Sequence, residues 1–267
     1  MREFSPLTFA WLRTAGAAIV LTLIAPRYEQ KLTRADHGRI ALYSLLGIVI
    51  NGTLFLAGLN FTTVQVAAVL ITTIPVFALV AAILIGQERT TVTRMAGIAM
   101  AGGGALLVVG GETFHGTSHS VLGAVMLILN CLAYALYLVL SKPTFARLGA
   151  RRVVTWLFAY GAVIMLPASA WWLWHEQWTT ISPRAWITLL IVIIGPVMTA
   201  YLLNAWALRH AESSFVAVYT YVQPVLATLL GAMFLGERIR GVIVIAAALI
   251  FTGVWLAGRA GTGPIAE

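Results

Sequence analysis

Long apolar runs separated by short polar gaps make up almost the whole chain. A helix needs about 20 apolar residues to cross the hydrocarbon core of a bilayer. By that standard the pattern predicts nine membrane spans, and their short connections indicate one compact bundle. The expected spans are residues 6–26, 40–59, 64–86, 95–111, 121–141, 153–174, 184–207, 213–235 and 240–258. The expected fold is therefore all-α, a polytopic membrane helix bundle.

One stretch of this pattern occurs twice. Residues 62–89, TTVQVAAVLITTIPVFALVAAILIGQER, return as AESSFVAVYTYVQPVLATLLGAMFLGER at 211–238. One offset superimposes Pro75 on Pro224, and it also superimposes the glutamate of each closing Glu-Arg pair. Each copy is a long apolar run that a proline interrupts. Many carriers consist of two related halves around a site near the membrane midplane, so the repeat favours a transporter.

The neighbouring spans extend the repeat. Residues 10–21, AWLRTAGAAIVL, resemble TWLFAYGAVIML at 155–166, which leaves the span 121–141 without a partner in the first half. We therefore expect a first repeat at 1–112 with four spans and a second at 121–260 with five. The pattern is that of an inverted five-plus-five repeat with its first helix missing from this sequence.

Basic residues are concentrated in alternate gaps. With the gap 27–39 on the cytoplasmic side, 12 of the 17 Lys and Arg residues fall on that side, four fall on the other, and Arg13 lies within a span. Because positive residues favour the cytoplasmic side, we expect a cytoplasmic C-terminus. The two Glu-Arg pairs then lie on opposite sides. The halves would thus be inverted copies, as in alternating-access carriers.

Composition supports the membrane assignment. Of the 267 residues, 60% are hydrophobic and 10% are charged, whereas a soluble domain carries about a quarter charged residues. The formal net charge of +8 is spread over the gaps, which indicates topology signals and not a nucleic-acid surface. Cys131 is the single cysteine, so an intrachain disulfide and a cysteine-based metal site are excluded.

The order and duplication of the motifs support a family resemblance. Gly-Gln-Glu-Arg at 86–89 and Gly-Glu-Arg at 236–238 each close a proline-containing span, and Gly-rich helices follow at 97–111 and 248–258. In this order the motifs resemble those of the drug/metabolite transporter (DMT) superfamily, EamA type. The resemblance implies ten helices in two inverted repeats, a bacterial origin and a location in the inner (cytoplasmic) membrane. It also implies export of a small metabolite such as an amino acid or an amphipathic compound.

Polar side chains inside the spans mark the candidate binding site, because such groups must face the bundle interior or water. On the span 121–141, spacings of four and three place Asn130, Tyr134 and Tyr137 on one helical face. Similar sets on other spans complete the predicted substrate-binding residues: Arg13, Asn51, Gln65, Asn130, Tyr134, Tyr137, Trp156, Tyr160, Tyr201, Asn204, Tyr219 and Gln223. The alternative is that they only hold the bundle together, at about 0.6 kcal/mol per hydrogen bond.

Repeated residues also supply candidate hinges and gates. Pro75 and Pro224 remove a backbone donor and free a carbonyl one turn earlier, so each span could bend or bind a ligand there. Glu88 and Glu237 close the same spans, where they could move with a gate or only cap turns. Arg13 could pair with an anionic group of a substrate, or its side chain could snorkel to the outer interface.

The remaining charged residues bear on mechanism. All nine acidic residues lie at span ends or in gaps, whereas carriers driven by protons or sodium usually have a carboxylate at membrane depth. The sequence therefore favours facilitated diffusion or exchange. The five histidines are scattered, which disfavours a membrane-embedded enzyme. A non-transporting partner subunit or an inactive truncated carrier stays open. We expect a small-molecule substrate and the lipid bilayer as partners, with no nucleic acid and no cofactor, in a monomer or homodimer.

Overall fold

The computed structural model describes residues 3–24, 32–87, 91–115, 118–211, 213, 216 and 241–259. Over these residues the chain is helical apart from short turns and contains no strand, which confirms the predicted all-α bundle. Within the same ranges, five helical segments are long and apolar enough to cross a membrane: Pro6–Leu23, Arg34–Leu59, Ser120–Leu148, Ala150–His175 and Pro183–His210. Shorter apolar helices cover Val69–Leu84, Met95–Gly104 and Val244–Gly253.

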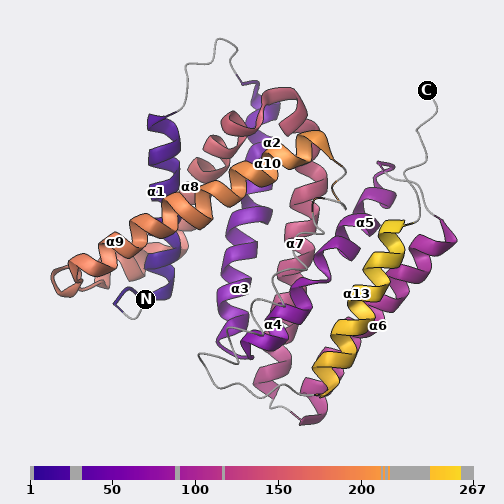
Figure 1. The fold of residues 1–267 in the computed structure, drawn as a ribbon. Coiled ribbons are helices and arrows are strands. Elements are labelled where there is room, and N and C mark those ends of the chain that lie inside the picture. Colours follow the sequence, from indigo (N-terminus) through magenta and orange to yellow (C-terminus); the bar gives the residue numbers. More distant parts are fainter. Residues whose placement is uncertain are drawn as a thin grey trace. The chain divides into compact units, whose positions relative to one another are not determined.

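Figure 1 shows these helices as a succession of coiled ribbons. In chain order they are α1 (Pro6–Leu23), α2 (Arg34–Ser44), the π-helix η1 (Leu45–Ile50), α3 (Asn51–Leu59), α4 (Val64–Ile71), α5 (Ile74–Leu84), α6 (Val92–His115), α7 (Ser118–Leu148), α8 (Ala150–His175), the 3-10 turn η2 (Trp178–Thr180), α9 (Pro183–Val192), the π-helix η3 (Ile193–Thr199), α10 (Ala200–His210) and α13 (Gly241–Arg259).

The chain divides into two compact units, and each unit takes residues from both halves of the sequence. Unit 1 comprises Met1–Thr53 and Leu140–Ala211, and unit 2 comprises Leu54–Val139 and Glu212–Glu267. Each unit is therefore assembled from segments that are far apart along the chain.

Side-chain caps fix where several helices of unit 1 begin. Ser5, Thr33 and Ser182 occupy the N-cap positions of α1, α2 and α9, and each hydroxyl accepts a hydrogen bond from a backbone N–H in the first turn. At α2 the cap is a reciprocal capping box, since the Asp36 carboxylate also accepts from the Thr33 backbone N–H. These polar residues end the preceding connections and fix the first turn of each helix, which at α2 lies before the apolar run that starts at residue 40.

Helices α6 and α13 pack side by side in unit 2 (Figure 1), and glycines permit the close approach. A Cβ atom on Gly253 would lie 2.5 Å from the carbonyl oxygen of Gly97 and 2.6 Å from the backbone nitrogen of Ala101. A Cβ atom on Gly104 would lie 2.8 Å from the carbonyl oxygen of Ala246. Small residues allow helix backbones to approach closely in lipid, so this contact tolerates nothing larger at either glycine.

Two helical segments contain a π-helix at matching places in the two halves. The offset of the sequence repeat puts residues 45–50, which form η1, onto residues 194–199, which lie within η3. Only η3 contains a proline, Pro196, so a proline is not the shared cause. A π-helical turn disturbs the regular backbone hydrogen bonding of a helix and occurs frequently at functional sites.

The span that contains Pro75 is broken. Helix α4 ends before Thr72, and α5 begins after Thr73 with Pro75 in its first turn. The two threonine hydroxyls donate to the carbonyls of Val69 and Leu70, three residues earlier, at 2.6 and 2.7 Å. The backbone N–H groups of the same threonines donate to the same two carbonyls, so the helix tightens at the interruption. The interruption lies at the position where the sequence predicts a bend, because proline cannot continue the helical hydrogen bonds.

Candidate functional site

The predicted site residues are divided between the two units. The members in unit 1 are Arg13, Asn51, Trp156, Tyr160, Tyr201 and Asn204. The members in unit 2 whose backbone is described are Gln65, Pro75, Asn130, Tyr134 and Tyr137. The predictions for Glu88, Tyr219, Gln223, Pro224 and Glu237, and for the side chain of Gln65, lie outside the described residues.

Arg13 lies near the middle of α1, beside the residues that follow η1. One terminal nitrogen of its guanidinium is so close to Gly52 that a Cβ atom there would be 3.2 Å from it. Tyr201 on α10 is near enough to interact electrostatically with the same group. The Arg13 side chain is half-buried. The structure thus brings together one residue from each of three helical segments that are distant in sequence.

Tyr201 connects α10 to the π-helix η1. Its hydroxyl donates to the carbonyl oxygen of Gly47 at 2.5 Å, which satisfies a backbone acceptor in the π-helical turn. Its ring meets Phe158 of α8 edge-on, with the ring centroids 5.0 Å apart. Two further predicted site residues lie on the same helical segments: Asn204 is buried and Asn51 is half-buried. These contacts hold the Tyr201 ring in place beside Arg13.

No described carboxylate forms an ion pair with Arg13. Three carboxylate side chains are described, and each has partners elsewhere: Glu3 binds Ser182, Asp36 binds Arg147, and Glu176 binds the start of α1. A charged side chain inside a membrane span is costly without a compensating partner. Within the described ranges, no cluster of three or more His, Cys, Asp or Glu side chains could hold a metal ion.

Two carboxylates outside the spans fasten the start of α1 to the connection between α8 and α9. Glu176 accepts from the Ser5 backbone N–H at 3.2 Å and hydroxyl at 2.8 Å, and Glu3 accepts from the Ser182 backbone N–H at 2.7 Å and hydroxyl at 3.0 Å. Burial acts to raise the pKa of Glu176, but hydrogen bonds from Thr8 and Ser5 outweigh it and lower that pKa. The Ser182 N–H and hydroxyl lower the pKa of Glu3. Helix N-termini favour such negative charges.

The sequence reasoning missed His37, which it placed in a gap among scattered histidines. The structure puts His37 on α2 against two predicted site residues of α8. The Tyr160 hydroxyl lies 2.6 Å from His37 Nδ1, and the Trp156 ring meets the imidazole edge-on at 4.9 Å. Trp156 and Tyr160 also contact each other, with ring centroids 5.7 Å apart. Their spacing of four residues signals a shared face, but nothing in the sequence signals that α2 lies against that face.

In unit 2 the predicted stripe lies on α7. Asn130 and Tyr137 are buried, Tyr134 is half-buried, and the two tyrosine rings are 5.5 Å apart. The thiol of Cys131 lies 3.4 Å from the carbonyl oxygen of Leu70, just before the interruption between α4 and α5. Helix α7 therefore contacts the broken span one residue away from Asn130.

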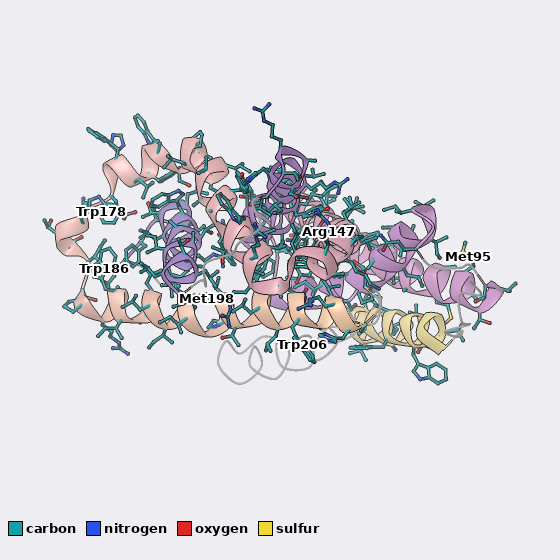
Figure 2. All side chains as sticks on the ribbon, turned by 90° about the horizontal axis from the view of Figure 1, so that it is seen from above. Met95, Arg147, Trp178, Trp186, Met198 and Trp206 are labelled. Carbon is teal, nitrogen blue, oxygen red and sulfur yellow. The ribbon has the colours of Figure 1, made fainter. Side chains whose placement is uncertain are left out.

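The long segment α9–η3–α10 has two different faces. Figure 2 labels Trp186, Met198 and Trp206 along it. Met198 in η3 is buried, whereas Trp206 on α10 is 58% exposed and Trp186 is 38% exposed. Exposed tryptophans on an apolar segment are typical of a lipid-facing surface. Tyr201 of this segment donates a hydrogen bond to Gly47 and interacts electrostatically with Arg13.

Comparisons with known proteins cover nearly the whole chain. The model of the EamA-like transporter family matches residues 1–110 and 121–259. An uncharacterized transporter of Archaeoglobus fulgidus is 24% identical over 259 residues, which cover 96% of this chain and 89% of that protein. The uncharacterized transporter YoaV of Bacillus subtilis is 25% identical over 269 residues (96% and 88%). Protein WALLS ARE THIN 1 of Arabidopsis thaliana is 25% identical over 289 residues (94% and 74%).

One solved structure extends these comparisons to the fold. This crystal structure superimposes with a TM-score of 0.67 at 18% identity, over 97% of this chain and 89% of the other. At such low identity the likeness shows a common fold and nothing more.

Proposed function

The chain belongs to the EamA-like transporter family of the DMT superfamily and is a multi-pass membrane transporter, and we propose that it exports a small metabolite by alternating access between two inverted repeats. The proposed cargo is an amino acid or a related amphipathic compound. The main support for this mechanism is the pair of π-helices, η1 and η3, which lie at equivalent places in the two halves of the sequence. Related halves that bend at equivalent points are suited to exchanging conformations across the membrane.

Alternating access requires helices that can change direction within the membrane. A π-helical turn and a proline are recognised causes of helix kinks, because both interrupt the regular backbone ladder. The chain has such points at η1, at η3 and before Pro75. We propose that Pro75 and its repeat partner Pro224 act as hinges, and that Glu88 and Glu237 move with the gates that these hinges open.

We propose that the transported solute meets the polar side chains predicted from the sequence. Support comes from burial: Asn130 and Asn204 carry amides, Tyr137 a hydroxyl, and all three are buried in helices that are otherwise apolar. Polar groups in that position are costly and are kept where they bind a partner or a ligand. Because no carboxylate is identified at membrane depth, we propose that the protein works by facilitated diffusion or exchange and not by coupling to protons or sodium.

Efflux from liposomes tests this function. The purified full chain would be reconstituted into liposomes loaded with the proteinogenic amino acids, their decarboxylated amines and simple monocarboxylates, and the released compounds would be measured by mass spectrometry. Gln223→Ala and Tyr137→Ala should each lower efflux at least about tenfold while the yield of folded protein stays unchanged, since each removes a hydrogen-bonding group of the proposed site.

Two further variants make this test specific. Tyr137 is completely buried, so Tyr137→Phe keeps its packing and removes only the hydroxyl. Trp174→Ala, at a side chain that is 86% exposed, should leave efflux unchanged. Wild-type efflux from Gln223→Ala, Tyr137→Ala and Tyr137→Phe alike would contradict the cavity assignment. A folded wild-type protein that releases none of these compounds would instead favour a non-transporting partner subunit or an inactive carrier.

We also propose a location in the inner (cytoplasmic) membrane with the C-terminus in the cytoplasm. The excess of Lys and Arg on one side of the predicted spans supports this orientation. A C-terminal green fluorescent protein fusion should fluoresce, and a C-terminal alkaline phosphatase fusion should be inactive, because the phosphatase needs an oxidising compartment. The opposite pair of results would reverse the orientation.

A further inference from the structure

We propose that Arg13, with Gly52 and Tyr201, binds the carboxylate of the transported solute. The inference rests on the proposed transport function and narrows its substrate class to compounds that carry a carboxylate, such as amino acids and organic acids. Amines and neutral solutes of the same carbon skeleton would then be excluded or poorly exported.

The positive charge of Arg13 favours an anionic ligand. Its guanidinium lies in a membrane span, and each described carboxylate is engaged elsewhere, at Ser182, at Arg147 or at the start of α1. A solute carboxylate would supply the compensating charge that this part of the chain does not. The guanidinium presents paired N–H donors that match the two oxygens of a carboxylate, which makes arginine the preferred residue for this recognition.

A glycine, Gly52, lies next to the Arg13 guanidinium. Gly52 has no side chain, and a Cβ atom there would already be 3.2 Å from the Arg13 nitrogen. This distance is shorter than an ordinary carbon–nitrogen contact, so a larger residue would crowd the guanidinium. The glycine therefore lets the guanidinium lie close to the backbone of α3, where a side chain at position 52 would compete with a small anion for the same place.

An aromatic residue, Tyr201, is held in position near the guanidinium. The Tyr201 ring is held by its hydrogen bond to Gly47 and by its edge-on contact with Phe158. An aromatic residue is thus held in a fixed position within electrostatic range of a positive charge. A compound with one carboxylate and an apolar body matches both features, because its charged end meets the guanidinium while its apolar part meets the ring.

A purely structural Arg13 would have a different setting. A snorkelling side chain extends along its own helix toward the interface and needs no neighbour on other helices. Arg13 instead lies against Gly52 of α3 and near Tyr201 of α10. Convergence of three segments on one cation favours a binding role over anchoring.

The loaded-liposome efflux assay tests the inference with matched solutes, for example leucine, 4-methylpentanoate and 3-methylbutylamine. Wild-type protein should release the carboxylate-bearing compounds and not the amine. Arg13→Gln should lower release of the carboxylates at least about tenfold, because loss of one charge-assisted hydrogen-bonded pair costs on the order of a factor of ten or more. Arg13→Lys should raise KM several-fold with little change in kcat, since lysine keeps the charge but loses the paired donors.

Two other variants separate binding from folding. Gly52→Val keeps the charge of Arg13 but crowds the guanidinium. It should therefore raise KM for carboxylates, and amines should still not be released. Arg209→Gln, at an exposed position on α10, is the matched control and should behave as wild type. Melting temperature and monodispersity would be recorded for every variant.

The outcomes distinguish this inference from the function on which it rests. Release of amines as fast as the matching acids, or wild-type kinetics in Arg13→Gln or Arg13→Lys, would overturn the carboxylate site and leave a transporter of another substrate class. Release of no compound by folded wild-type protein would overturn the transport proposal itself, and this inference with it.

Discussion

The two units hold their helices together in different ways. In unit 1, Trp11, Ser44 and Tyr201 donate hydrogen bonds to backbone carbonyls of other helices, at 2.9, 2.7 and 2.5 Å. In the described part of unit 2, glycines bring helix backbones into contact. A Cβ atom on Gly123 would lie 2.9 Å from the carbonyl oxygen of Gly58, and one on Gly253 would lie 2.5 Å from that of Gly97.

This difference shows two solutions to one physical problem. Lipid tails are as apolar as the helices, so burial of apolar surface does not drive helices together inside a membrane, and close packing or hydrogen bonding must do so. The glycine contacts of unit 2 are steric. One of the polar contacts of unit 1, the hydrogen bond from Tyr201 to Gly47, involves a residue that interacts electrostatically with the charged Arg13. Substitutions should therefore act through volume in unit 2 and through lost polar partners in unit 1.

The largest effect is expected at the glycine contact of unit 2. Gly253→Ala would place a methyl group 2.5 to 2.6 Å from backbone atoms of α6, which cannot rotate out of the way. Overpacking of this kind costs about 1–3 kcal/mol, which would appear as a lower melting temperature of the purified protein. Gly102→Ala is the control, because no atom lies within 4 Å of its Cβ position. Equal melting temperatures for the two variants would contradict the steric account.

A smaller loss is expected at the polar end of α2 in unit 1. Asp36 completes the capping box with Thr33 and also binds Arg147. Asp36→Ala removes the carboxylate that accepts hydrogen bonds from Thr33 in the capping box, which should destabilise the protein by about 1 kcal/mol apart from the ion pair. Arg147→Gln removes only the ion pair, in which the Arg147 side chain is half-exposed, and should have a weaker effect. If Arg147→Gln lowered the melting temperature more than Asp36→Ala, the ion pair and not the cap would stabilise this end.

A single interhelical hydrogen bond should contribute less again. Ser44 is completely buried, and its hydroxyl donates to the Leu157 carbonyl of α8. Ser44→Ala should cost about 0.6 kcal/mol, the average for such bonds in a membrane protein. Thr22→Val is the comparison, because the Thr22 hydroxyl bonds only to a carbonyl of its own helix. An equal change in melting temperature for both variants would mean that the hydrogen bond to α8 stabilises the protein no more than a hydrogen bond within one helix.

The smallest effect concerns pH. Native hydrogen bonds lower the pKa of Glu176 below its ordinary value of 4.5. Such a group stabilises the native state fully above the unfolded pKa, and the contribution is lost as the pH falls through the lower native value. The melting temperature of wild-type protein should therefore drop slightly more between pH 6 and pH 3 than that of Glu176→Gln. Parallel curves would show that the contact between Glu176 and Ser5 does not matter for stability.

Much of the fold was predictable because membrane helices are encoded by composition and length. The expected span 6–26 corresponds to α1, and the expected span 184–207 lies within the segment Pro183–His210. The interruption at Pro75 was predictable because proline lacks a backbone donor. The π-helix η1 was not, since its sequence Leu-Leu-Gly-Ile-Val-Ile has the pattern of an ordinary apolar helix.

The candidate site was only partly predictable. Arg13 and Tyr201 were marked as polar residues in apolar spans, but their proximity depends on how α1 and α10 pack, and helix periodicity carries no information about that. Gly52 and Gly47 carried no signal at all, because glycine is common in membrane helices. His37 was misjudged because its contact with Tyr160 joins residues 123 positions apart.

The central claim is that the chain carries a solute by exposing one site alternately to the two sides of the membrane. Counterflow tests it most directly. Liposomes containing the protein would be preloaded with a high concentration of an exported carboxylate and diluted into a trace of the same compound carrying a radiolabel. With wild-type protein, the label should accumulate transiently inside the liposomes above its equilibrium level. Arg13→Gln should abolish this overshoot. Uptake that rises to equilibrium without this overshoot would contradict a carrier mechanism.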